Sequence, residues 1–129
     1  MDFDVAAMPF AKLMGVEITH ADKGRVEGRL TVRDDLCTAG NILHGGALMA
    51  FADALGAVGG FLNLPAGART TTLESKTNFI GAARAGTTVS AVSTPLHVGR
   101  RSSVWQTRIE GEDGRLVGLV TQTQMTITD

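Results

Sequence analysis

Apolar and polar residues alternate along most of this chain, which is typical of β-strands with one buried face. The alternating runs cover residues 15–20, 25–32, 70–80, 87–98, 102–110 and 115–127. Residues 22–24 and 111–114 have the composition of hairpin turns, and Pro95 predicts a bulge or an edge position. Residues 34–43 are expected to form a loop. Since the last three runs follow one another with short links, we expect an antiparallel sheet.

Residues 45–62 follow a helical pattern instead, and a shorter helix is expected at residues 8–14. One apolar stripe of the long helix should pack on the sheet; it contains Leu48, Phe51, Leu55, Val58 and Leu62. Asp53 is the only carboxylate, lysine or arginine between residues 42 and 68. A surface helix would carry a charged face, so this helix is expected to be covered on nearly all sides.

Asp53 falls almost opposite the apolar stripe when the residues are placed about 100° apart on a helical wheel. Its neighbours on that face are small or uncharged, among them Gly46, Met49 and Ala50. Two interpretations remain open: the face meets water, or a second copy of the chain covers it and leaves a crevice for Asp53. The second is favoured because a wet face normally carries more charge and because a buried carboxylate needs a partner or a task.

His44, Gly45 and Gly46 stand where the long helix begins, and the first amides of a helix have no intrahelical acceptor. Such amides can bind a developing oxyanion, although two glycines can also simply permit a tight turn. Gly45 and Asp53 are eight residues apart, or about 12 Å along a helix, so one chain cannot easily bring both to one carbonyl group. Two antiparallel helices related by a two-fold axis could, which predicts a homodimer with shared sites.

Length and composition limit the number of domains, the kinds of partner and the cell compartment. A chain of 129 residues suits one domain, spanning residues 1–129. Charges nearly balance, at 12 basic against 13 acidic residues, so we expect no nucleic-acid or membrane partner. Cys37 is the only cysteine, and residues 1–4 lack the basic and apolar stretches of a signal peptide. We therefore expect a cytoplasmic protein.

The segment from Leu43 to Ala47, with Asp53 nine residues after His44, resembles the hotdog-fold acyl-CoA thioesterases of the phenylacetate-degradation type. Residues 9–16 and 97–102 share this likeness, which extends over nearly the whole chain. The resemblance implies an α+β hotdog fold, in which a curved antiparallel sheet of about six strands wraps one long central helix. It further implies hydrolysis of an acyl-CoA to carboxylic acid and CoA, no cofactor besides the CoA of the substrate, and a dimer or a homotetramer built from two dimers.

The same resemblance assigns roles to single residues. The amide of Gly45 would polarise the thioester carbonyl, and Asp53 of the facing subunit would attack it or activate water. His44 would shape the loop, Gly46 would contact the substrate, and Thr72 would help to place water. Thr38 stands where relatives often carry Asn or Gln, and the nearby Asn41 is a possible substitute.

Three polar residues between two predicted strands, Arg100, Arg101 and Ser102, could hold the CoA phosphates, although a solvated hairpin tip is the commoner fate of such a pair of arginines. A thiol nucleophile at Cys37 is disfavoured, since no third group is placed to orient His44. The histidines show no metal-ligand spacing, so no metal is expected. Two other functions stay open: a hotdog hydratase or dehydratase, and a non-catalytic acyl-CoA-binding protein.

Overall fold

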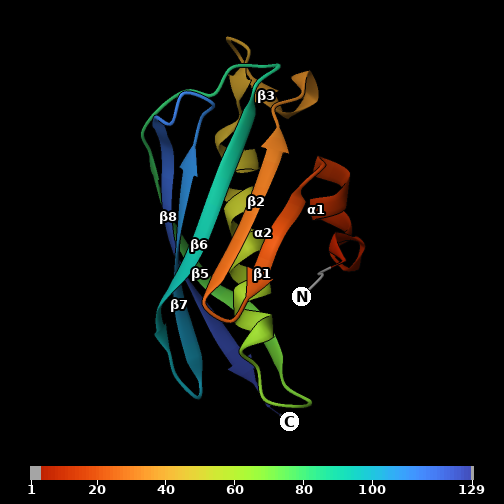
Figure 1. Ribbon diagram of the computed structural model, residues 1–129, viewed down its shortest axis with the longest axis vertical. Helices are drawn as coiled ribbons and strands as arrows, with labels where there is room; N and C mark the ends of the chain where they lie inside the picture. Colours follow the sequence, from red (N-terminus) through yellow and green to blue (C-terminus); the bar gives the residue numbers. More distant parts are fainter. Residues whose placement is uncertain (1–3, 129) are drawn as a thin grey trace.

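The computed structural model describes residues 4–128 and consists of one long helix lying along a curved antiparallel sheet (Figure 1). Most of the acidic start, residues 1–3, lies outside the described residues. The helix is α2 (Gly45–Leu62). In spatial order, the sheet contains β1 (Glu17–Asp22), β2 (Arg25–Thr31), β6 (Thr88–Val98), β7 (Ser102–Glu110), β8 (Leu116–Ile127) and β5 (Arg69–Phe79). This arrangement confirms the expected α+β hotdog architecture.

Short elements precede α2 and lie at its sides. They are η1 (Val5–Ala7), α1 (Pro9–Met14), η2 (Asp34–Leu36), β3 (Cys37–Thr38) and β4 (Ile42–Leu43). The prediction that residues 34–43 form only a loop is therefore wrong, because η2 and the β3–β4 hairpin occupy most of this segment. The bulge expected near Pro95 is confirmed by a register shift between Pro95 and His97.

The apolar stripe of α2 forms the centre of the core. Phe51 and Leu55 are fully buried, and Leu48 and Val58 are 3% and 1% exposed. Trp105 of β7 is also fully buried. At about 25 cal/mol per Å² of apolar surface, such side chains each contribute roughly 1.5–3 kcal/mol when buried. The predicted packing face of the helix is therefore confirmed.

The helical wheel predicts that Asp53 points away from the sheet, but the structure shows that it does not. Its carboxylate hydrogen-bonds to side chains of β5 and β8, which are strands of the sheet itself. The prediction is wrong because a wheel treats the sheet as flat, whereas this sheet curls around α2. Glycines on α2 let the helix lie close to the sheet on this side. A Cβ atom on Gly59 would lie 2.6 Å from the ring of Trp105, and one on Gly60 would lie 3.0 Å from Gln124.

A bulge interrupts the alternation of β5. The register with β8 shifts between Thr72 and Glu74, which places one extra residue in β5. Thr72 and Ser75 are half-buried on the helix side, whereas Leu73 is 64% exposed. Uninterrupted alternation would put Leu73 and Ser75 on the same face, so this part of the predicted pattern is wrong. The bulge lies directly beside the residue that contacts Asp53.

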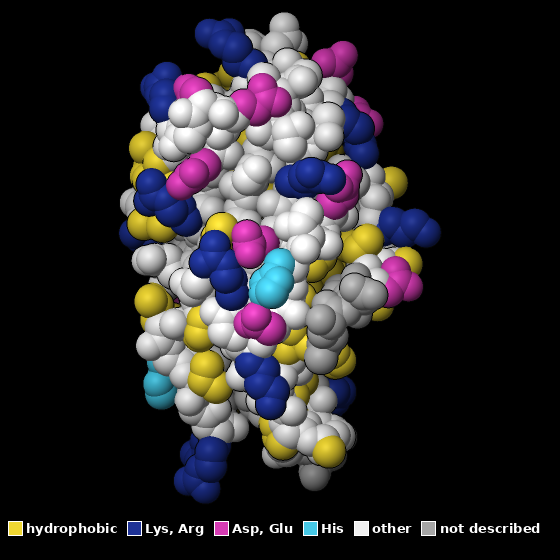
Figure 2. All heavy atoms as spheres, viewed as in Figure 1, with side chains coloured by type: hydrophobic (Ala, Val, Ile, Leu, Met, Phe, Trp, Pro, Cys, Tyr) yellow, Lys and Arg dark blue, Asp and Glu magenta, His cyan; other side chains and the backbone are white. Residues whose placement is uncertain are grey.

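The length and composition of α2 match those of a membrane-spanning helix, with a mean hydropathy of 1.5, yet half of it is buried inside the fold. The core helix of a globular protein has the same composition, and α2 takes that place here. Acidic and basic side chains are interspersed on the face that Figure 2 shows. On β1 and β2 they form exposed pairs, such as Arg29 with Glu17 and Arg25 with Glu27. Exposed pairs of this kind each contribute only about 0–1 kcal/mol to stability.

Candidate active site

Asp53 is held by two donors on the same oxygen. The hydroxyl of Thr72 on β5 donates to Oδ1 at 2.6 Å, and the amide Nε2 of Gln122 on β8 donates to Oδ1 at 3.1 Å. Oδ2 accepts no hydrogen bond from residues 4–128 that the structure records. The carboxylate is half-buried, so one oxygen is anchored and the other stays available.

A cavity of about 280 Å³ opens beside Asp53, between α1 and α2. Its other walls are apolar, and they include Met8, Pro9, Phe10 and Ala57. Small side chains on this side of α2 leave the room that larger ones would fill. Asp53 is therefore the only ionisable group among the described residues that line this cavity.

The first turn of α2 is capped by His44. Its ring atom Nδ1 accepts a hydrogen bond from the amide of Gly46 at 2.8 Å, which requires the ring proton to lie on Nε2 when the ring is neutral. The amide of Gly46 is thereby engaged within the chain. The amide of Gly45 donates to no acceptor recorded among the described residues, and it begins the positive end of the helix dipole.

Gly45 also lies close to an aromatic ring. A Cβ atom on Gly45 would lie 2.9 Å from the ring of Phe79, at the end of β5. The ring itself is 58% exposed. Glycine at position 45 therefore allows the ring of Phe79 to lie close to the start of α2, and a side chain here would displace Phe79.

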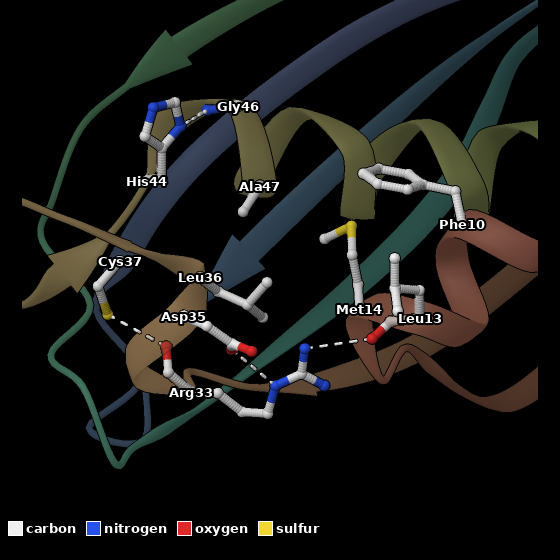
Figure 3. Close-up of a pocket in the computed structure, with 10 residues that line it drawn as sticks. All are labelled: Phe10, Leu13, Met14, Arg33, Asp35, Leu36, Cys37, His44, Gly46 and Ala47. Atoms are coloured by element: carbon white, nitrogen blue, oxygen red, sulfur yellow. Dashed lines mark hydrogen bonds and ion pairs between the residues drawn. The ribbon is translucent and has the colours of Figure 1, made fainter.

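A second cavity, of about 410 Å³, lies next to the start of α2 (Figure 3). His44, Gly46 and Ala47 form one side of it, and the apolar side chains of Phe10, Leu13, Met14 and Leu36 form much of the rest. Arg33 and Asp35, paired at 3.0 Å, close the side away from α2. Cys37 also lines this cavity, and its thiol donates to the carbonyl of Arg33.

Phe10 lines both cavities, with an exposed fraction of 64%. The cavity beside Asp53 and the cavity beside Gly46 are thus neighbours along the groove between α1 and α2, with Phe10 as their shared wall. The residues that line the two cavities are mainly apolar.

Two of the expected substrate-binding residues lie elsewhere. Thr38 pairs with Ile42 in the β3–β4 hairpin, and Asn41 occupies the turn between these strands. Asn41 has a φ of 58°, a conformation that asparagine tolerates better than most residues. The structure therefore gives Asn41 a role in the turn, and it lines neither cavity of the α1–α2 groove.

The expected phosphate-binding residues lie at the opposite end of the molecule from Gly45. Arg100 and Arg101 form the β6–β7 turn, and the carbonyl of Arg101 accepts from the amide of Thr126. Thr126 pairs with Thr70, which lies close to Gly60 near the end of α2. Within one chain, these arginines and the start of α2 are thus separated by most of the helix, which is about 27 Å long.

Sequence reasoning missed two residues of the site, Gln122 and Gln124. In the sequence they alternate with threonines near the end of the chain, which is equally compatible with an outward-facing position. In the structure they are 0% and 1% exposed and lie beneath α2. The available signal was the glycine face of α2, since Gly56 and Gly60 leave space that large side chains of a facing strand must fill.

Comparison with known proteins identifies the family. The family described as the Thioesterase superfamily matches residues 40–118, which include the start of α2 and Asp53. The 1,4-dihydroxy-2-naphthoyl-CoA hydrolase of Escherichia coli strain K12 is 33% identical over 103 residues, which cover 80% of this chain and 75% of that protein.

Solved structures agree in fold. Thioesterase HI1161 from Haemophilus influenzae superposes with a TM-score of 0.88 at 26% identity, covering 99% of this chain and 93% of that one. The PaaI protein from the phenylacetic acid degradation operon of Escherichia coli, at 23% identity and a TM-score of 0.87, covers 96% and 91% of the two chains and shows the same fold. The expected enzyme class is confirmed, and the chain belongs to the thioesterase superfamily.

Proposed function

We propose that this chain hydrolyses an acyl-CoA thioester to a free carboxylic acid and CoA, with Asp53 as the reacting carboxylate. The observation that carries the proposal is the state of this side chain, which is half-buried, anchored through Oδ1 and directed at an apolar groove. A carboxylate so placed can attack the carbonyl carbon to form an anhydride, or can take a proton from an attacking water. In either case the C–S bond breaks and CoA leaves as the thiol. On the first route a water molecule then hydrolyses the anhydride, which releases the carboxylic acid and restores the Asp53 carboxylate.

The amide of Gly45 would stabilise the negative charge that develops on the carbonyl oxygen. Such donors must be in place before the reaction, and the first amide of a long helix meets this condition. Gly46 is the weaker candidate, because its amide already donates to His44. His44 then acts by fixing the helix start, and it is not proposed as a base.

The site would be shared between two copies of the chain. Gly45 and Asp53 lie on one helix, about 12 Å apart, so an antiparallel arrangement of two helices is needed to bring the pair to one thioester. The edge strand β5 supports this proposal, since its outer side is open and carries the exposed apolar residues Leu73 and Phe79. We expect homodimers with two sites each, and pairs of dimers as the complete assembly.

An antiparallel dimer would also explain where Arg100, Arg101 and Ser102 lie. The end of one α2 would adjoin the start of the other, so the β6–β7 turn of one subunit would flank the site at the partner's Gly45. There the guanidinium groups could bind CoA phosphates. We propose no cofactor beyond the CoA of the substrate, and we place the reaction in the cytoplasm, where CoA esters are handled.

One assay tests the reaction. The wild-type protein and Asp53→Asn are offered a panel of aryl, medium-chain and hydroxylated acyl-CoAs, and free thiol is followed. We expect wild-type turnover on at least one member and a loss of about 10²-fold or more in the variant, the size expected when an acid–base group is removed. Similar turnover in both proteins would overturn the role of Asp53, and no thiol from any member would overturn the reaction.

Two further measurements complete the test. Hydrolysis in H₂¹⁸O, followed by mass analysis of the peptide that contains Asp53, tests for a covalent step: ¹⁸O in Asp53 identifies a nucleophile, because the label enters the side chain only when water attacks the Asp53 carbonyl carbon of an anhydride. Mixing Gly45→Val with Asp53→Asn subunits tests the shared site. A mixed dimer that contains one intact pair recovers activity if the two residues act across the interface.

A further inference from the structure

A directed chain of hydrogen bonds runs beneath α2 and ends at Asp53. Thr70 Oγ1 donates to Gln124 Oε1 at 3.1 Å, and Gln124 Nε2 donates to Thr72 Oγ1 at 2.7 Å. Thr72 Oγ1 then donates to Asp53 Oδ1 at 2.6 Å. Gln124 and Thr72, in the middle of the chain, thus each accept one hydrogen bond and donate the next.

The direction of the chain is fixed by Gln124. A threonine hydroxyl has one proton, and Thr72 can spend it on Asp53 only if its other neighbour is a donor. The amide nitrogen of Gln124 is that donor, and the amide oxygen accepts from the hydroxyl of Thr70. With the amide reversed, Thr72 would face two acceptors and could satisfy only one of them.

Gln122 supplies a second donor to the same oxygen from two residues earlier in β8. It is fully buried, and its Oε1 has no hydrogen-bond partner among the described residues. An unpaired buried oxygen reduces the stability of the fold. Valine or leucine would fill the same space without this cost, so stability alone does not account for two glutamines here.

From this arrangement we infer that Gln122 and Gln124 are positioning residues, which fix the orientation of Asp53 and keep Oδ2 directed at the thioester. Gln122 acts directly on Oδ1, and Gln124 acts through the hydroxyl of Thr72. Neither touches the substrate. The inference rests on the proposed function of Asp53, and it adds that the rate of the chemical step depends on side chains buried beneath the helix.

The test removes the donor of Gln124 while keeping the size of the side chain. Gln124→Met is expected to lower kcat about 10-fold with KM changed by less than about two-fold, the effect of losing about one hydrogen bond in the chemical step. Gln106→Met is the matched control: this glutamine lies on β7, and its alternation with buried Trp105 and Thr107 places it on the outer face of the sheet. Its kcat should equal that of the wild type.

Non-additivity distinguishes positioning from a general structural effect. Because Gln124 acts through Thr72, adding Gln124→Met to Thr72→Val should lower kcat by less than about two-fold more. Thr70→Val is a second, milder variant, which releases the amide of Gln124 and should lower kcat about three-fold, a part of one hydrogen bond's effect. Multiplicative losses in the double variant, or an unchanged kcat in Gln124→Met, would overturn the inference.

The failures of the two proposals are separable. One possible outcome is that the wild type hydrolyses an acyl-CoA, that Asp53→Asn is inactive and that Gln124→Met is fully active. This outcome would contradict only the inference about the glutamines. If Asp53→Asn is as active as the wild type, the proposed function falls first and the inference falls with it. Thermal unfolding of each variant shows whether a loss of kcat occurs in a folded protein.

Discussion

The side-chain amide of Gln122 lies directly against Gly56, in the middle of α2. A Cβ atom on Gly56 would overlap the amide carbon, oxygen and nitrogen of Gln122. The missing side chain therefore lets Gln122 reach Oδ1 of Asp53 from β8. Helix and sheet approach closely at the point where the carboxylate is held.

Gly56→Ala should consequently reduce activity more than stability. Alanine favours the helix by about 0.5–1 kcal/mol over glycine, but its methyl group must displace the amide of Gln122. We expect kcat to fall about 10-fold, as for the loss of one charged hydrogen bond. Thiol release and thermal unfolding, measured on the same preparation, check this result. A variant with wild-type kcat would contradict the contact.

Gly59→Ala should show the opposite balance. The added Cβ would lie 2.6 Å from the buried ring of Trp105, which has no flexible end that could move aside. Overpacking of this kind costs about 1–3 kcal/mol. Denaturant unfolding should detect the loss. Gly24→Ala is the control, since the nearest atom to a Cβ atom there is 3.7 Å away, and its stability should change little.

Thr72 offers a test by conservative replacement. Thr72→Val removes the hydroxyl that donates to Asp53 and should lower kcat about 10-fold or more, whereas Thr72→Ser keeps the donor and should stay within about three-fold of the wild type. Initial rates at saturating acyl-CoA provide the comparison. Equal losses in both variants would assign the effect to packing of the methyl group instead.

The cap of α2 predicts a stability difference at His44. His44→Ala removes the acceptor for the amide of Gly46 and should lower the free energy of unfolding by about 0.5–2 kcal/mol. Asparagine is a favourable N-cap residue, so His44→Asn should recover most of this loss. Urea unfolding of the three proteins measures the effect. An Ala variant as stable as the wild type would show that the cap contributes nothing.

Asp22, at the β1–β2 hairpin, carries a prediction about pH. Its hydrogen bond with His20, followed by the amide of Gly24, holds the pKa of Asp22 below its usual 3.8. Because the folded pKa is the lower one, the contribution of Asp22 to stability is present above 3.8 and is lost as the pH falls through the folded value. His20→Ala should raise the pKa of Asp22 towards 3.8, as followed by carboxyl-carbon NMR. An unchanged titration would exclude His20 as the cause.

Periodicity was sufficient to predict the main elements. Glycines mark the start of α2 and an asparagine follows its end, so the sequence predicted both ends of the helix, at residues 45 and 62. The alternating strands could be recognised because each has one buried face. Asp53 could be singled out because it is the only charged side chain in a long apolar segment.

The surroundings of Asp53 could not be predicted in the same way. Thr72 and Gln122 are 19 and 69 residues from Asp53 in the chain, and no local pattern reports such contacts. The bulge after Thr72 adds one residue to β5, and nothing in the local sequence marks where this extra residue lies. The curvature of the sheet, which brings β5 and β8 around the helix, is a property of the whole assembly of strands.

The glycines of α2 also fix how far the helix can slide along its own axis. If α2 moved by one turn, side chains such as Ala52 or Leu55 would arrive where Gly56 and Gly59 now meet Gln122 and Trp105. Only one axial setting accepts all the bulky side chains of the strands. The glycines therefore set the axial position of the helix, and this position determines which residue of α2 faces the hydroxyl of Thr72.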